Sequence, residues 1–145
     1  MGLKLERRQL VYRAALLHDP GQGKLDEAEW LVVREHPLLS QRIMERVPSF
    51  GEMARIAGRH HERLDGTRYP FGLKGGELLL EDRIVAVADV YGALVEDRPY
   101  RKGLEAEQII ALLKKEVSGR LDPECFEALL AVMEEGVVER ECVYR

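Results

Sequence analysis

The hydrophobic positions along this chain recur mainly with helical spacing. Val11, Ala14, Ala15 and His18 follow the i, i+3, i+4, i+7 pattern, which places them on one side of a helix. Repeated alternation of apolar and polar residues, the pattern of a half-buried β-strand, is not found. We therefore expect the 145 residues to form a single all-α domain. Only the last segment, residues 137–145, is ambiguous between helix and strand.

A second helix should begin at Asp26, which has the spacing of a capping box with Glu29. Pro37 either kinks this helix or begins the next one, because proline fits the first turn of a helix but not its interior. Beyond Pro37, two apolar sets are expected on buried helix faces: Leu39, Ile43 and Val47, and then Met53, Ile56, Ala57 and His60.

Three more helices are expected in the second half of the chain. In the segment 81–95 the helical period places Asp89 within an apolar stripe, where an unpartnered carboxylate would be costly. Asp122 and Pro123 have the residue types of an N-cap and a first helical position. The three apolar sets are Val85, Ala88 and Gly92; Ile109, Ile110, Leu113 and Val117; and Phe126, Leu129, Leu130 and Met133.

Residues 65–76, "DGTRYPFGLKGG", interrupt the helical pattern with four glycines and a proline. This composition is typical of an ordered loop with specific turns. Functional residues are often carried by such loops, so we expect this one to contribute to a site.

The net charge of -4 and the pI near 5.6 argue against binding to DNA or a membrane through the overall field of the protein. An anionic ligand would have to be small and locally bound. Cys125 and Cys142 are far apart and form no CxxC motif, and no apolar run of membrane length is present. We expect a cytoplasmic protein in which both cysteines are buried structural thiols.

Several histidines and carboxylates are expected on inward faces. Taken singly, each could be a hydrogen-bonded core residue, but His18, His36, His60 and Asp89 lie on four different predicted helices. Neighbouring side chains on a helix diverge by about 100° and cannot share one buried position, so the adjacent histidines at 60 and 61 indicate a shared ligand, such as a metal ion. A divalent iron, manganese or zinc ion fits mixed imidazole and carboxylate ligands. Such an ion polarises a phosphoryl oxygen and lowers the pKa of its water.

The chain also resembles a known family. The motifs "ALLHD", "REHP", "HHERLDGTRYPFGLKGGEL" and "RIVAVADVYGALVEDRPYRK" occur in an order and spacing similar to the HD-GYP branch of the HD-domain phosphohydrolases. The resemblance implies an HD-type helical bundle with two or three metal ions, usually iron or manganese. It also implies hydrolysis of cyclic di-GMP or a related cyclic dinucleotide by a metal-bound hydroxide.

The resemblance assigns roles to individual residues. Asp19 would bridge two metal ions, and Arg98 and Arg101 would hold phosphate close to it, although exposed or structural salt bridges are an open alternative for the two arginines. The implied metal ligands are His18, Asp19, His36, His60, His61 and Asp89, and the implied substrate loop comprises Asp65, Gly66, Tyr69, Pro70 and Lys74.

The chain departs from the family pattern at four places. No histidine occurs upstream of His18, residues 20–22 replace Ile-Gly-Lys, Arg68 replaces the glycine of the GYP motif, and Gly92 stands where a second aspartate is common. Two functions follow as alternatives: a weakly active phosphodiesterase with a reduced ligand set, or a non-catalytic module that binds a partner protein or the nucleotide for signalling.

The departures also lead to expectations about metal binding and assembly. One metal site should be built from Asp19, His36, His60 and His61, whereas a second ion, held by His18, Asp19 and Asp89, should bind more weakly. A bundle without the usual upstream helix should leave an apolar groove beside His18 and Asp89, and we expect a homodimer to cover it.

Overall fold

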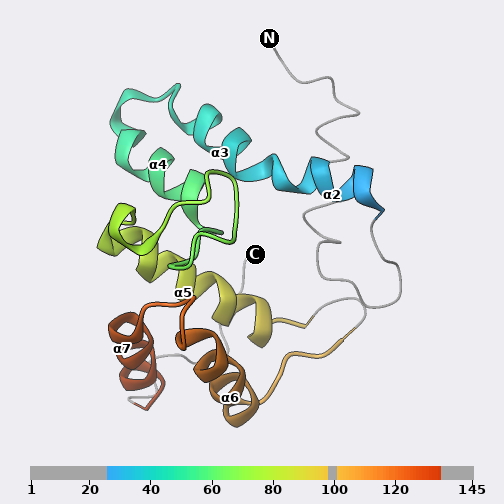
Figure 1. Cartoon of the computed structure of the whole chain (residues 1–145), viewed down its shortest axis with the longest axis vertical. Helices are drawn as coiled ribbons and strands as arrows, with labels where there is room; N and C mark the ends of the chain where they lie inside the picture. The colour runs from blue at the N-terminus through green and yellow to red at the C-terminus, as the bar shows by residue number, and fades with distance from the viewer. Residues whose placement is uncertain (1–25, 98–100, 135–145) are drawn as a thin grey trace.

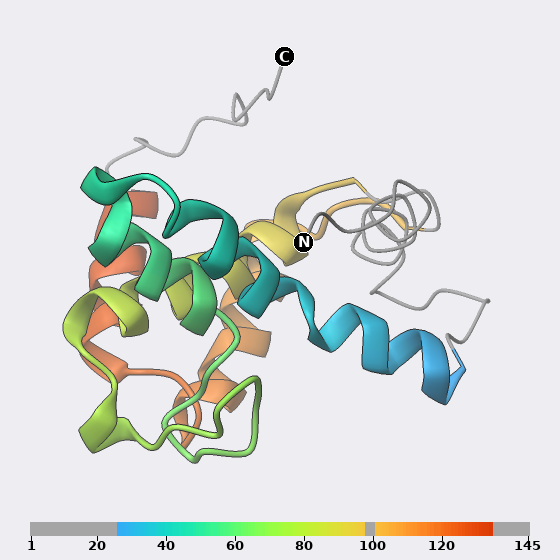
Figure 2. The same cartoon turned by 90° about the horizontal axis from the view of Figure 1, so that it is seen from above.

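The computed structural model describes residues 26–97 and 101–134, which Figure 1 and Figure 2 show from two directions. Over these two ranges the regular structure is helical, and Asp65 and Lys74 form an isolated β-bridge. The predicted all-α fold is confirmed. In the same residues, no helix combines the length and the apolar character that crossing a bilayer requires. The elements are α2 (Glu27–Arg34), α3 (His36–Met44), η1 (Pro48–Phe50), α4 (Gly51–Arg59), η2 (Gly75–Glu77), α5 (Leu80–Val95), α6 (Ala106–Val117) and α7 (Pro123–Glu134).

Helices α2 and α3 follow each other with only Glu35 between them (Figure 1). The predicted capping box is present, since Asp26 and Glu29 each accept the other's backbone N–H at 2.8 Å. Helix α2 ends at Arg34, and Pro37 lies in the first turn of α3. Pro37 therefore lies in the first turn of a new helix and does not kink the old one. This arrangement puts His36 at the first position of α3.

Helices α3 and α4 form an antiparallel hairpin joined by η1 (Figure 1). The two helices pack closely where Gly58 faces the side chain of Gln41. The prediction that Ile43, Val47 and Met53 are buried is wrong, because 63%, 41% and 48% of their surfaces are exposed. Helix α3 ends at Met44, and the hairpin turns before Val47, so these side chains lie near the turn.

Helix α5 lies between the α3–α4 hairpin and the pair α6–α7 (Figure 1). Its core face consists of Ala86 and Val87, whereas Ala88, in the stripe expected to be buried, is exposed. The helix is apolar on most sides, so the sequence pattern could not identify one buried face. The main core comprises Ala86, Val87, Ile109, Leu113, Leu121, Cys125 and Phe126.

Helices α6 and α7 follow the prediction closely. Asp122 caps α7 by accepting the backbone N–H groups of Glu124 at 2.9 Å and Cys125 at 3.1 Å. Cys125 is a buried free thiol whose pKa is raised by burial, as expected for a structural cysteine. The prediction for Cys142 and the ambiguous segment 137–145 lie outside the described residues.

A candidate metal centre beside an arginine-lined cavity

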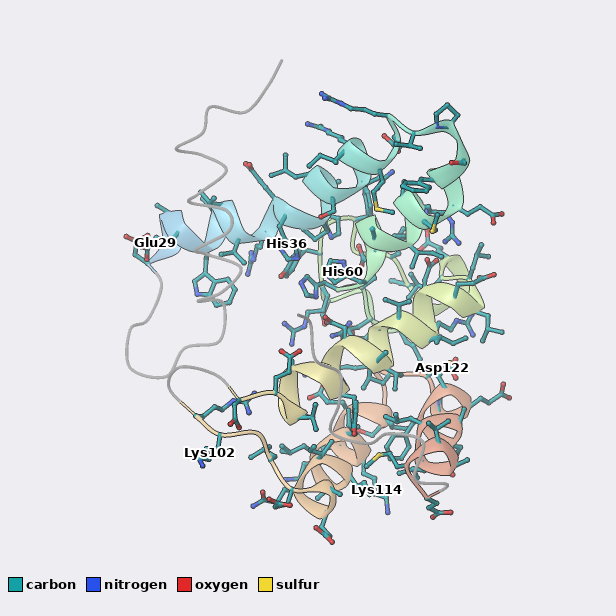
Figure 3. The ribbon with its side chains drawn as sticks, turned by 180° about the vertical axis from the view of Figure 1, so that it is seen from behind. Glu29, His36, His60, Lys102, Lys114 and Asp122 are labelled. Atoms are coloured by element: carbon teal, nitrogen blue, oxygen red, sulfur yellow. The ribbon has the colours of Figure 1, made fainter. Side chains whose placement is uncertain are left out.

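Three histidine side chains converge where α3 begins and α4 ends. His36 is the first residue of α3, His60 caps the C-terminus of α4, and His61 follows it. The Nε2 atom of His36 lies 3.1 Å from the Nε2 atoms of both His60 and His61. Figure 3 labels His36 and His60, which lie next to each other at this junction. The predicted grouping of these three residues is therefore present.

The adjacent histidines His60 and His61 converge because α4 ends directly before them. Helix α4 ends at Arg59, and the N–H of Glu62 then donates to the carbonyl of Arg59 at 2.9 Å in a turn. This turn removes the divergence that two neighbouring helical positions would have. The ring centroids of His60 and His61 are 3.9 Å apart. Both rings can thus serve one site.

The hydrogen bonds at the other ring nitrogens determine where the protons lie. The Nδ1 atoms of His36 and His60 lie 2.7 Å from the carbonyl oxygens of Val33 and Ala57. A carbonyl oxygen only accepts, so each Nδ1 carries a proton, and in the neutral ring each Nε2 then carries a lone pair. Nδ1 of His61 similarly faces a carboxylate oxygen of Asp89 at 3.2 Å. Three Nε2 lone pairs therefore face one small region.

This donor set fits a divalent metal ion. The ligand atoms of His36, His60 and His61 lie within 4.8 Å of one another and could hold one ion. Lone pairs directed at each other repel, and a cation between them removes that repulsion. Each Nδ1–H is meanwhile held by an oxygen, as is usual for metal-binding histidines.

Burial adjusts the ionisation of these groups toward the forms that bind metal. Burial lowers the pKa values of His60 and His61, which favours neutral imidazoles. For Asp89, burial alone would raise the pKa, but the hydrogen bond from His61 and nearby positive charges lower it overall. Asp89 is therefore ionised and holds the Nδ1 proton of His61. Its predicted role as a direct ligand stays a prediction.

A cavity of about 1190 Å³ adjoins His61 and Asp89. Its walls include the aromatic rings of Trp30 and Tyr69, and the Tyr69 centroid lies 5.0 Å from that of His61. Arginines outnumber carboxylates in the lining, so the cavity suits an anionic ligand with flat, stackable groups. The lining arginines are Arg34, Arg63, Arg68, Arg101 and Arg120.

Among the residues of the predicted substrate loop, Tyr69 lines this cavity, and Pro70 follows it through a cis peptide bond. Asp65 instead pairs with Arg120 at 3.3 Å and accepts hydrogen bonds from Thr67. The backbone of the neighbouring Gly66 has φ of +70°, which favours glycine. Lys74 is exposed, and its backbone N–H donates to the side chain of Glu77. The substrate roles of Asp65, Gly66, Pro70 and Lys74 stay predictions.

Arg101 lies on the cavity wall as well. Its guanidinium donates to the carbonyls of Ala93 and Leu94 near the end of α5. These bonds fix its side chain at the edge of the cavity, and its predicted contact with phosphate stays a prediction. His18, Asp19 and Arg98 lie outside the described residues, so the predictions made for them stay open.

Sequence reasoning missed several residues of the site. Arg34, Arg63 and Arg120 come from three separated segments and meet only in the fold. The available signals were positional: Arg34 is the first residue of the "REHP" motif, and Arg63 lies two positions after His61. Nothing in the polar run "RHHERLDG" distinguishes Glu62, which proves to be completely buried.

Comparison with known proteins identifies the family. The family model described as "HD domain" matches residues 7–125. The chain belongs to the HD-domain family. The membership expected from the sequence motifs is confirmed, and the histidine cluster accords with the metal dependence of HD-domain phosphohydrolases.

Relatives of this HD-domain chain carry names of phosphodiesterases. It is 43% identical to 3'3'-cGAMP-specific phosphodiesterase 3 of Vibrio cholerae, over 81% of this chain and 28% of that protein. It is 39% identical to the cyclic di-GMP phosphodiesterase response regulator RpfG of Xanthomonas campestris, over 90% and 38%. A cyclic di-GMP phosphodiesterase of Thermotoga maritima is 37% identical, over 84% and 37%. The chain thus spans about a third of the length of these relatives.

Proposed function

We propose that this HD-domain chain is the catalytic part of a metal-dependent phosphodiesterase that hydrolyses cyclic di-GMP or 3'3'-cGAMP. The observation that carries the proposal is the convergence of three Nε2 atoms beside an arginine-lined cavity. The names of its relatives support the same substrate class. A cyclic dinucleotide carries two phosphates and two flat bases, which match guanidinium and aromatic groups respectively.

His36, His60 and His61 would hold a divalent ion, with Asp19 as a further ligand. His18, Asp19 and Asp89 would hold a second ion more weakly. Iron or manganese is proposed, with zinc as an alternative, because mixed imidazole and carboxylate ligands suit these ions. When bound, such an ion supplies Lewis-acid polarisation of a phosphoryl oxygen and of water.

The residues of the chain orient the reaction. The arginines of the cavity would bind the two phosphates, and Tyr69 would support a base at the wall. Asp89 keeps the proton of His61 on Nδ1, so that Nε2 remains a ligand atom. In the reaction, the oxygen of water forms a bond to phosphorus while one ring P–O bond breaks. The leaving oxygen takes a proton, and the cyclic dinucleotide opens to a linear one.

The proposal is tested with full chain purified without chelator. Cobalt(II) binding is measured by its visible absorption, and hydrolysis of both cyclic dinucleotides is measured with added manganese or iron. His36→Ala and His60→Ala should weaken cobalt binding at least about tenfold and abolish turnover, because each removes one ligand. Glu52→Ala, an exposed change on α4, serves as the control. Unchanged cobalt binding in both histidine variants would exclude this site, and metal binding without turnover would favour the non-catalytic module.

We also propose a cytoplasmic homodimer that works with a signalling protein. Exposed apolar side chains on α3 and α5, including Ile43, Leu80 and Ile84, support a further interface. One relative is named a response regulator, which supports a signalling context. Light scattering at increasing concentration tests the assembly, and a monomer at every concentration would refute it.

A further inference from the structure

Glu62 is a completely buried carboxylate directly after the metal-binding pair of histidines. None of its surface is exposed. Its Oε1 accepts the backbone N–H groups of Phe71 at 2.7 Å and Gly72 at 3.2 Å, and its Oε2 accepts that of Leu73 at 2.9 Å. A buried charge is costly unless it is hydrogen-bonded, and three N–H donors satisfy this requirement.

The three donors come from consecutive residues, so the backbone at 71–73 curls around the carboxylate. Successive N–H groups that point into one concavity form an anion-binding nest. Gly72 has φ of +67°, a conformation that other residues adopt only with strain. The anion that fills this nest is the side chain of Glu62 itself, so the nest serves the loop rather than an external ligand.

The remaining hydrogen bonds close the loop only at its base. The N–H of Gly75 donates to the carbonyl of Leu64 at 3.0 Å, and Asp65 pairs with Lys74 in the isolated bridge. Glu62 instead reaches the middle of the loop, next to Tyr69. The ring of Tyr69 lies against His61 and also lies 5.8 Å from the guanidinium carbon of Arg34. The position of this cavity wall therefore depends on the side chain of Glu62.

We infer that Glu62 is a positioning residue that fixes the 69–73 segment against the metal centre and so sets the wall of the substrate cavity. It touches neither the ion nor the substrate, because its two oxygens are occupied by backbone N–H groups. The effect on activity rests on the proposed phosphodiesterase function, whereas the effect on the loop does not. Loss of the anchor should therefore weaken substrate binding while the three histidines keep their metal.

Glu62→Gln tests this role with almost no change in volume. The amide oxygen can still accept from Phe71 and Gly72, but the NH₂ group then faces the N–H of Leu73, and two donors oppose each other. Hydrogen exchange at the Leu73 amide should accelerate at least about tenfold. The KM for cyclic di-GMP should rise about tenfold. Cobalt binding and kcat should stay within about twofold of the wild type.

Glu77→Gln is the matched control, because Glu77 is exposed and accepts a single N–H, that of Lys74, at the end of the same loop. It should leave exchange at Leu73 and KM unchanged. Gly72→Ala is a second variant, which strains the nest without removing the buried charge. It should reproduce the higher KM and the faster exchange, and it keeps the inference testable if Glu62→Gln does not fold.

The readouts separate failure of this inference from failure of the proposed function. Exchange at Leu73 that is as slow in both variants as in the wild type would overturn the anchoring role. Faster exchange with an unchanged KM would overturn the role in the substrate wall. If the wild type does not hydrolyse the nucleotide, calorimetric titration with cyclic di-GMP replaces KM. Equal affinities of wild type and both variants would then overturn the inference.

Discussion

Removal of the Asp82 carboxylate should destabilise the protein strongly, because this group ties α4 to α5. Nη1 of Arg55 lies 2.6 Å from both oxygens of Asp82, and Nη1 of Arg59 lies 3.5 Å from one of them. The same carboxylate accepts the N–H of Leu79 at 3.1 Å, at the start of α5. The Asp82 side chain has no exposed surface. Asp82→Ala removes all of these interactions at once.

The magnitude follows from two contributions. Loss of the hydrogen bond at the helix start costs about 1 kcal/mol. Breaking a fully buried ion pair costs about 3–5 kcal/mol, but Arg55 remains 25% exposed and can turn toward water, so about 2 kcal/mol is expected here. The free energy of unfolding should therefore fall by about 3 kcal/mol. For a domain of this size, the corresponding decrease in Tm is about 9 °C.

The assay is thermal unfolding followed by circular dichroism in the presence of chelator, because bound metal would add its own stabilisation. Glu81→Ala is the matched control, since Glu81 is exposed in the same first turn of α5, and it should cost less than about 0.5 kcal/mol. If the Tm of Asp82→Ala lies within roughly 1 °C of the control, the reasoning about this ion pair is wrong.

Three further changes test other parts of the fold. Gly92→Ala should raise the free energy of unfolding by about 0.7 kcal/mol, because a Cβ at this helical position meets nothing within 4 Å; a decrease in Tm would contradict this. Gly58→Ala should cost about 2 kcal/mol, because its Cβ would overlap Oε1 of Gln41 and lie 3.2 Å from Cβ of Gln41. Adding Gln41→Ala should recover part of the loss, and additive losses would refute the clash. Asp122→Asn should cost about 1 kcal/mol at pH 7. Burial alone would raise the pKa of Asp122, but backbone hydrogen bonds and Arg83 lower it overall. The stabilisation by this carboxylate is therefore present above about pH 4 and is lost as the pH falls further. A difference in unfolding free energy between wild type and variant that persists at about pH 2 in urea unfolding would contradict this.

Local features of the fold could be predicted from sequence because their causes lie within a few residues. The capping box of Asp26 and Glu29 and the cap at Asp122 each depend on spacing and residue type alone. The exposure of Ile43 and Val47 could not be predicted in the same way. It depends on where α3 ends and on which of its sides meets α4, and a helical period does not fix either.

The candidate site also has features with local causes, which could be predicted, and features that depend on the fold, which could not. The histidines could be found from sequence, because several of them on predicted inward faces needed a common explanation. Their actual convergence depends on the end of α4 at Arg59 and on the turn at Glu62. The buried state of Glu62 was not predictable, because its three partners are backbone N–H groups about ten residues away, and any residue type supplies such groups.

The second half of α4 and the residues after it contact several described parts of this candidate site. Arg55 pairs with Asp82 of α5, His60 and His61 offer two of the clustered Nε2 atoms, Glu62 accepts backbone N–H groups of the loop, and Arg63 lies 3.9 Å from a carboxylate oxygen of Asp89. A displacement of this segment would therefore move the candidate metal ligands and the cavity wall together. Changes at its two ends should still be separable, because the link to α5 acts mainly on stability and the loop anchor acts mainly on substrate affinity.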